Sequence, residues 1–97
     1  MTVVAVHGYA GGRVQGVGFR RHARLQAVQL GLCGWVRNCP DGRVEYFLEG
    51  DGQALQSMLA WLRSGPAAAR VDSLSEQDCL AQGLTDFQVR EDAPSGQ

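Results

Sequence analysis

The spacing of hydrophobic residues along the chain predicts two helices separated by extended segments. Between positions 19 and 30, apolar side chains recur at three- and four-residue intervals with polar ones between them, which is the spacing of one helix face. Gly31 is placed to end this helix. A second helix is expected over residues 52–64, followed by Gly65 and Pro66. Its apolar face consists of Leu55, Met58, Leu59 and Leu62.

Runs of β-branched and aromatic residues, bounded by residues that favour turns, predict the strands. These strands cover residues 2–10, 32–38, 43–49, 71–77 and 85–90. The turn between the second and the third is expected at 38–42, a stretch rich in turn formers. The order β-α-β-β-α-β indicates an α+β fold, a ferredoxin-like βαββαβ sandwich. We therefore expect an antiparallel sheet with two helices on one face and an extra C-terminal strand.

Length and composition favour one small domain. A chain of 97 residues, 44% of them hydrophobic, can bury a core without disulfides or metal. We expect residues 1–90 to form this domain. Residues 91–97 carry no large apolar side chain and are expected to be a flexible tail.

Charge and cysteine content argue against several classes of function. The formal net charge of −1 at pH 7 disfavours broad electrostatic binding to nucleic acid or to an anionic membrane. Cys33, Cys39 and Cys79 are odd in number and lack CxxC spacing, so neither a disulfide framework nor a zinc site is indicated. Nothing at the N-terminus resembles a signal peptide, and no segment has membrane-spanning length. These features predict a cytoplasmic protein, with a monomer as the simplest expectation.

The densest chemical signal is a glycine-rich stretch, residues 12–20, between the first strand and the first helix. Its three glycines allow backbone conformations closed to residues with a Cβ atom, so consecutive N–H groups can form a concave nest for an anion. A helix beginning near Phe19 would point unsatisfied amides and the positive end of its dipole into the same space. Arg20 adds a planar set of donors that matches phosphate or carboxylate oxygens. The stretch predicts an oxyanion cradle.

Two better-known phosphate motifs do not fit this stretch. A dinucleotide-binding fingerprint would need a third glycine at position 21, which is arginine. A P-loop would end in Gly-Lys-Ser/Thr, and the chain contains no lysine. From glycine spacing alone, an ordinary turn followed by a solvated arginine is still an alternative.

The full string Gly-Arg-Val-Gln-Gly-Val-Gly-Phe-Arg at residues 12–20 resembles the signature of the acylphosphatase family, small enzymes that hydrolyse carboxyl-phosphate mixed anhydrides. The resemblance continues in one register over essentially residues 3–90. The further similar segments are 30–38, 41–45 with Gly50, 65–67, 69–71 and 86–89. The departures are small: a double glycine at 11 and 12, and a cysteine at position 39.

The resemblance implies which residues act. Arg20 matches the family's essential arginine, and Asn38 matches an asparagine with a catalytic role. The phosphate-binding backbone N–H groups would be those of Gln15, Gly16, Val17, Gly18, Phe19 and Arg20. If the strand at 32–38 lies beside the first strand, Asn38 at its carboxyl end comes near the cradle.

The implied reaction needs neither metal nor cofactor, because an acyl phosphate is already activated by its stable carboxylate leaving group. The enzyme would hold the phosphoryl group of a small-molecule acyl phosphate and place a water in line with the departing oxygen. The side-chain amide of Asn38 would orient this water. In the family, a phosphate oxygen of the substrate is thought to accept its proton.

Other polar residues are interpreted as structural. His7 and His22 are alternative bases, although such residues are more often ordinary strand or helix-surface histidines. Glu45 and Glu49 lie on one strand face and are expected to be solvated rather than paired for acid–base chemistry. Arg13 and Arg21 either add positive potential around the cradle or face solvent.

Two further functions compete with hydrolysis. The first is a non-catalytic acylphosphatase-like module that binds carbamoyl phosphate or another oxyanion. The second is RNA binding, which ferredoxin-like folds also support, but this chain lacks the aromatic signature and the basic surface that RNA recognition uses. The identity of the acyl group stays open, because no clear pocket for it is indicated.

Overall fold

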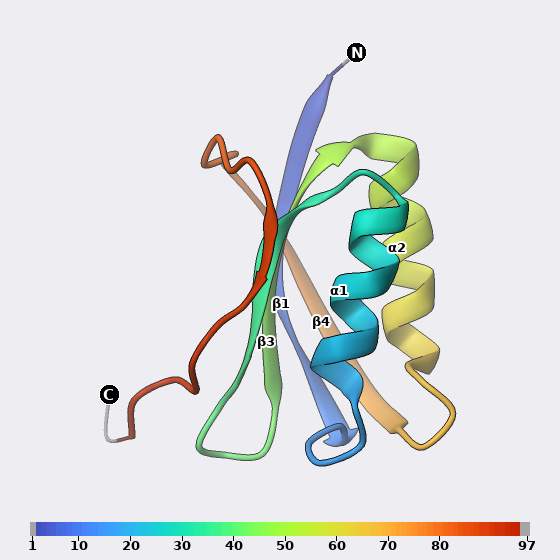
Figure 1. Ribbon diagram of the computed structural model, residues 1–97, viewed down its shortest axis with the longest axis vertical. Helices are drawn as coiled ribbons and strands as arrows, with labels where there is room; N and C mark the ends of the chain where they lie inside the picture. Colours follow the sequence, from blue (N-terminus) through green and yellow to red (C-terminus); the bar gives the residue numbers. More distant parts are fainter. Residues whose placement is uncertain (1, 96–97) are drawn as a thin grey trace.

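The computed structural model describes residues 2–95, which form a five-stranded sheet with two helices packed on one of its faces (Figure 1). The elements are β1 (Val3–Arg13), α1 (Phe19–Gln29), β2 (Cys33–Asn38), β3 (Val44–Asp51), α2 (Gly52–Ser64), β4 (Arg70–Cys79) and β5 (Phe87–Val89). This order confirms the expected ferredoxin-like α+β fold and its extra C-terminal strand. No helix within residues 2–95 is long and apolar enough to cross a membrane.

The strand order is β4-β1-β3-β2-β5, which corrects one expectation. The condition on which Asn38 was brought near the cradle, that β2 lies beside β1, is not met, because β3 returns from the β2–β3 turn and inserts between them. Ala10 of β1 and Asn38 of β2 both pair with Val44 of β3. Ala10 and Asn38 are therefore level, and roughly 10 Å apart at two strand spacings, while β1 continues beyond this level to Arg13. The sheet is antiparallel except for β5, which pairs parallel to β2.

The core lies between the helices and the covered face of the sheet. The predicted apolar stripes are buried on both helices: Phe19, Ala23 and Ala27 on α1, and Leu55, Met58, Leu59 and Leu62 on α2. Tyr46 of β3 is also buried there, and its hydroxyl donates to the carbonyl of Ser75 at 2.7 Å. Burial of these faces is the main stabilising contribution to the fold.

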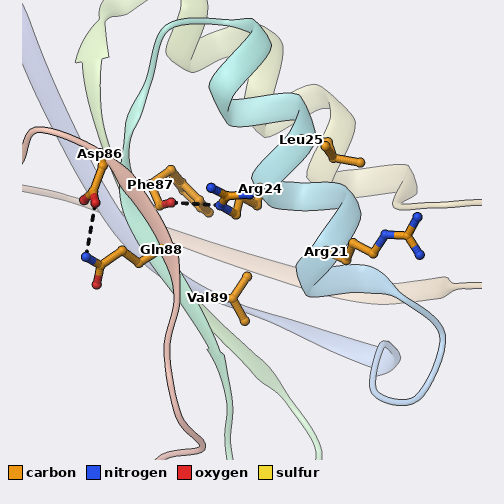
Figure 2. A pocket seen from close by; sticks show the side chains of 7 residues that line it. All are labelled: Arg21, Arg24, Leu25, Asp86, Phe87, Gln88 and Val89. Atoms are coloured by element: carbon orange, nitrogen blue, oxygen red, sulfur yellow. Dashed lines mark hydrogen bonds between the residues drawn. The ribbon is translucent and has the colours of Figure 1, made fainter.

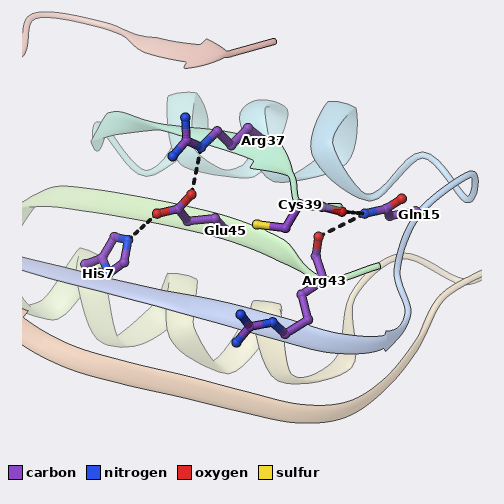
Figure 3. A network of polar contacts seen from close by, with 6 residues as sticks. All are labelled: His7, Gln15, Arg37, Cys39, Arg43 and Glu45. Carbon is purple, nitrogen blue, oxygen red and sulfur yellow. Dashed lines mark hydrogen bonds and ion pairs between the residues drawn. The ribbon is translucent and has the colours of Figure 1, made fainter. Parts of the chain in front are cut away.

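The open face of the sheet, opposite the helices, is more covered than the sequence indicates. We expected Glu45 to be solvated, and this is wrong, since it is only 7% exposed. Its carboxylate accepts from Nε2 of His7 at 2.6 Å and from Nε of Arg37 at 2.7 Å (Figure 3). Because β3 is central in the sheet, strands on both sides supply these partners. Pairing on two sides allows the carboxylate to be buried.

The second acidic residue of this face is buried for a different reason. Glu49 is 5% exposed, so its expected solvation is also wrong. Its carboxylate accepts backbone N–H groups from Gln82, Gly83 and Leu84 at 3.1–3.2 Å. The segment between β4 and β5 therefore closes over one end of β3, and the acid holds that segment in place.

The ion pairs of Glu45 predict a pH dependence of stability. Burial raises the pKa of the Glu45 carboxyl, but hydrogen bonds from His7 and Arg37 outweigh burial, so the pKa is lowered from its ordinary 4.5. The stability that the charged form contributes is therefore present above the unfolded-state pKa and is lost as pH falls through the lower folded-state value. We expect Glu45→Gln to lower the free energy of unfolding by about 2 kcal/mol at pH 7, and by less at acidic pH.

Urea denaturation at several pH values measures this difference. Glu76→Gln is the matched control, because Glu76 forms an exposed ion pair with Arg63 at 3.3 Å. An exposed pair contributes little, so the control is expected to cost less than about 0.5 kcal/mol at any pH. Equal losses for the two variants would contradict the buried role of Glu45.

The ends of two strands differ from expectation. β1 continues to Arg13 rather than ending at residue 10, because the register against β4 shifts between Gly11 and Gly12. Gly12 has φ of 117°, and a Cβ there would lie 2.3 Å from the carbonyl oxygen of Arg70, so only glycine fits this bulge. β5 is shorter than the expected 85–90.

The chain after β5 continues along the edge of β2. Arg90 N donates to Val36 O at 2.9 Å, and Ala93 N donates to Asn38 O at 2.8 Å. That residues 91–97 form a flexible tail stays a prediction, and positions 96 and 97 lie outside the described residues. The hydrogen bond from Ala93 brings this segment to the end of β2.

Candidate active site

The loop joining β1 to α1 is anchored by apolar side chains and bent by glycines. Val14 and Phe19 are buried in the core, and Val17 packs against it. Between them, Gly16 and Gly18 have φ of 74° and 77°, left-handed conformations that other residues rarely adopt. Buried anchors that alternate with left-handed glycines hold the loop in one shape at the edge of the core.

The backbone N–H groups of this loop have no partners in the described part of the chain. The first helical hydrogen bond of α1 runs from His22 N to Gly18 O at 3.1 Å, and none is formed by the N–H groups of residues 15–20. No side chain caps the N-terminus of α1, and its first turn contains no acidic residue. Six consecutive unpaired donors at the positive end of a helix dipole are an arrangement suited to binding an anion.

Arg20 is the charged side chain of this site. It lines a cavity of about 190 Å³ together with loop residues 14, 16 and 18, and its side chain is 36% exposed. Its Nη1 atom lies 3.7 Å from Oδ1 of Asp92, which is 69% exposed. The pair is long and solvated, so the interaction is weak and the guanidinium is accessible to a better-placed anion.

Asn38 ends β2 with an unsatisfied side chain. Its Oδ1 atom is buried and has no hydrogen-bond partner among residues 2–95. A buried polar atom without a partner is costly, and such atoms in folded proteins usually face a water or a ligand. Asn38 is not among the residues that line the cavity at Arg20.

Two contacts connect Asn38 with the loop. The side-chain amide of Gln15 donates both to Cys39 O at 2.9 Å and to Arg43 O at 3.0 Å, which ties the loop to the turn that follows Asn38 (Figure 3). The consecutive residues Asp92 and Ala93 contact Arg20 and the carbonyl of Asn38 respectively. The structure therefore places the predicted residues at one end of the sheet.

The remaining candidates are engaged elsewhere. His22 Nδ1 contacts Gly18 O at 2.8 Å, and His7 pairs with Glu45 on the open face. Burial, with added repulsion from Glu45, raises the pKa of the Cys39 thiol, so it is protonated near neutral pH and a poor nucleophile. No group of three or more His, Cys, Asp or Glu side chains within residues 2–95 is arranged to hold a metal ion.

The unpaired amides beside Arg20 are typical of a class of protein that binds phosphate-like oxyanions at the start of a helix. Comparison with known proteins identifies one family within that class. The model of the acylphosphatase family matches residues 6–89. The chain is 47% identical over 90 residues to the acylphosphatase of Pseudomonas paraeruginosa, which covers 93% of this chain and 99% of that protein.

Solved structures agree with this match. An acylphosphatase from Coxiella burnetii is similar with a TM-score of 0.88 and 34% identity, over 91% of this chain and 93% of that one. An acylphosphatase from Bacillus subtilis is similar with a TM-score of 0.87 and 35% identity, over 90% of this chain and 98% of that one. The chain belongs to the acylphosphatase family, and its function is that of this family of enzymes.

Proposed function

We propose that the cradle binds the phosphoryl group of a small acyl phosphate. The single observation that carries this proposal is the row of unpaired N–H groups ending at Arg20. These amides belong to Gln15, Gly16, Val17, Gly18, Phe19 and Arg20. They can donate to the phosphoryl oxygens while the Arg20 guanidinium bridges two of them.

The reaction is hydrolysis at phosphorus. The oxygen of a water forms a new bond to phosphorus, and the bond between phosphorus and the acyl oxygen breaks. The electron pair of that bond stays on the acyl oxygen, which leaves as a carboxylate. Both protons of the water end on the phosphate, so RCO–OPO₃²⁻ and H₂O give RCOO⁻ and H₂PO₄⁻. The transition state carries charge on the phosphoryl oxygens, where the amides and Arg20 would stabilise it.

Asn38 would align the attacking water. Its unpaired buried Oδ1 can accept a hydrogen bond from that water, while its amide N–H₂ can donate to the substrate. A phosphate oxygen of the substrate would take the proton, since the two histidines contact other groups. The positive charge that stabilises the transition state comes from Arg20 and from the helix N-terminus, and hydrolysis would therefore need no metal.

Phosphate release from acetyl phosphate, measured with and without EDTA, tests this function. We expect the same rate in both, and no release from a simple phosphomonoester, whose alkoxide leaving group is far less stable. Strict dependence on added metal would refute the mechanism. Tight phosphate binding without turnover would instead favour the oxyanion-binding module.

We also propose the cellular compartment, the oligomeric state and the domain bounds of the protein. Cys33, Cys39 and Cys79 are free, which supports a reducing compartment such as the cytoplasm. The formal net charge of −1 supports action without nucleic acid or membrane, and a monomer is the simplest assembly. We propose residues 1–90 as its single domain, although Met1 lies outside the described residues.

The bridge made by Gln15 leads to a prediction. Gln15→Met keeps the length of the side chain but removes both donors, so the loop and the turn after Asn38 are free to separate. We expect kcat for acetyl phosphate to fall about tenfold, with a smaller change in the inhibition constant of inorganic phosphate. Steady-state kinetics separates the two constants. Gln53→Met, at an exposed position of α2, is the control and is expected to retain kcat.

A further inference from the structure

A groove continues from the cradle along α1. The cavity at Arg20 shares Arg21 and Val89 with a larger hollow of about 580 Å³ between α1 and β5 (Figure 2). The larger hollow is also lined by Leu25 of α1 and by Phe87 of β5. Because the same two residues line both hollows, they meet at the N-terminal end of α1. A chemical group that is attached to a phosphate in the cradle can therefore extend into this groove.

The walls of this groove are held at a fixed separation. Arg21, Arg24 and Leu25 are spaced so that they share one face of α1. Arg24 Nε donates to the carbonyl of Phe87 at 3.1 Å, and Phe87 itself is buried in the core (Figure 2). The helix and the strand are thus joined across the floor of the groove, which is preformed rather than dependent on a ligand.

The groove presents apolar surface next to two arginines, Arg21 and Arg24, and one carboxylate, that of Asp86. Leu25 is 54% exposed and Val89 is 42% exposed, and both line the same hollow. Arg21 takes part in none of the ion pairs formed within residues 2–95. Apolar side chains beside a free guanidinium suit an apolar group that ends in a carboxylate.

We propose that this groove binds the acyl half of the substrate and makes the rate depend on the apolar size of that half. The proposal rests on the proposed function, because the phosphoryl group occupies the cradle and the acyl group must extend out of it. Where the two hollows meet, Arg21 faces the acyl oxygen, on which negative charge develops as the bond to phosphorus breaks. Leu25 and Val89 provide the contact for the apolar body.

The ratio of kcat/KM for benzoyl phosphate to that for acetyl phosphate tests the groove. The wild-type protein is expected to favour benzoyl phosphate. Leu25→Ser is expected to lower the ratio about fivefold, because the ring loses apolar contact. Val28→Ser is the matched control: Val28 is 56% exposed on the same helix and lines neither hollow, so the ratio is expected to stay at the wild-type value.

An unchanged ratio in Leu25→Ser, or an equal fall in Val28→Ser, would contradict binding of the acyl group in the groove, while the proposed hydrolytic function would stand. Release of phosphate from neither substrate by the wild-type protein would instead overturn the proposed function, and the groove with it.

A second variant tests the role of Arg21 separately. Arg21→Gln is expected to lower kcat for both substrates about tenfold, since both produce a carboxylate at the same place. Arg63→Gln on α2 removes an exposed arginine that lines neither hollow and is the control for net charge. An unchanged kcat in Arg21→Gln would show that Arg21 does not stabilise the charge on the acyl oxygen.

Discussion

Replacement of Arg20 by glutamine is expected to lower kcat/KM for acetyl phosphate by about a thousandfold. The guanidinium belongs to the last residue in the row of unpaired amides, and it lines the cavity beside them together with Arg21. Charge on the phosphoryl oxygens increases toward the transition state, so the loss of this cation affects catalysis more than substrate binding. The inhibition constant of inorganic phosphate is expected to rise as well.

The stability of the protein separates this effect from misfolding. Arg20 contributes only a long, exposed contact with Asp92, so the melting temperature of Arg20→Gln is expected to match that of the wild-type protein closely. Arg70→Gln is a matched control, because Arg70 also pairs with an exposed aspartate, Asp72, at 3.2 Å. If Arg20→Gln retained half of the wild-type activity, Arg20 would have no catalytic role.

The local features of the fold could be predicted from the sequence. Residues 52–64 form α2 as expected, because an apolar stripe defines the helix and Gly65, with φ of 69°, ends it. The order of strands could not be predicted in the same way. Alternation along the segment 32–38 correctly separates Val36 from Trp35, but it carries no information on which strand lies beside it.

The burial of the two acids on β3 could not be predicted for the same reason, because it depends on which segments lie beside β3 in the fold. Glu45 is covered by partners 38 and 8 residues away, and Glu49 by a segment more than 30 residues away. A pattern read along one strand shows only which face a residue occupies. Whether that face is covered depends on side chains and loops that the tertiary fold brings to it.

The same distinction between local features and distant contacts applies to the site. The loop was predictable, because the left-handed conformations of Gly16 and Gly18 follow from what only glycine tolerates. The bridging side chain of Gln15 and the contact from Asp92 were not, because each joins segments that are distant in the sequence. The polar residues of the motif therefore predict the chemistry, whereas the contacts that hold them in register become visible only in the structure.

Asn38→Ala is expected to lower kcat about a hundredfold while KM changes little, if the amide aligns water rather than holds substrate. Because Oδ1 is buried without a partner, its removal also deletes an unsatisfied polar group from the protein. The free energy of unfolding is therefore expected to stay near that of the wild-type protein, although a half-buried side chain is shortened. A large loss of activity without a loss of stability is typical of a residue retained for catalysis.

Asn38→Asp distinguishes alignment of water from the shape of the site. Aspartate has the same size, but it replaces the donor by a second acceptor and adds a negative charge beside a dianionic substrate. We expect its KM to rise together with the fall in kcat, and the KM increase to diminish as salt screens the repulsion. Steady-state kinetics at several salt concentrations measures both constants. A rise in KM alone for Asn38→Ala would assign this residue to substrate binding, and the water would then need another partner at the end of β2.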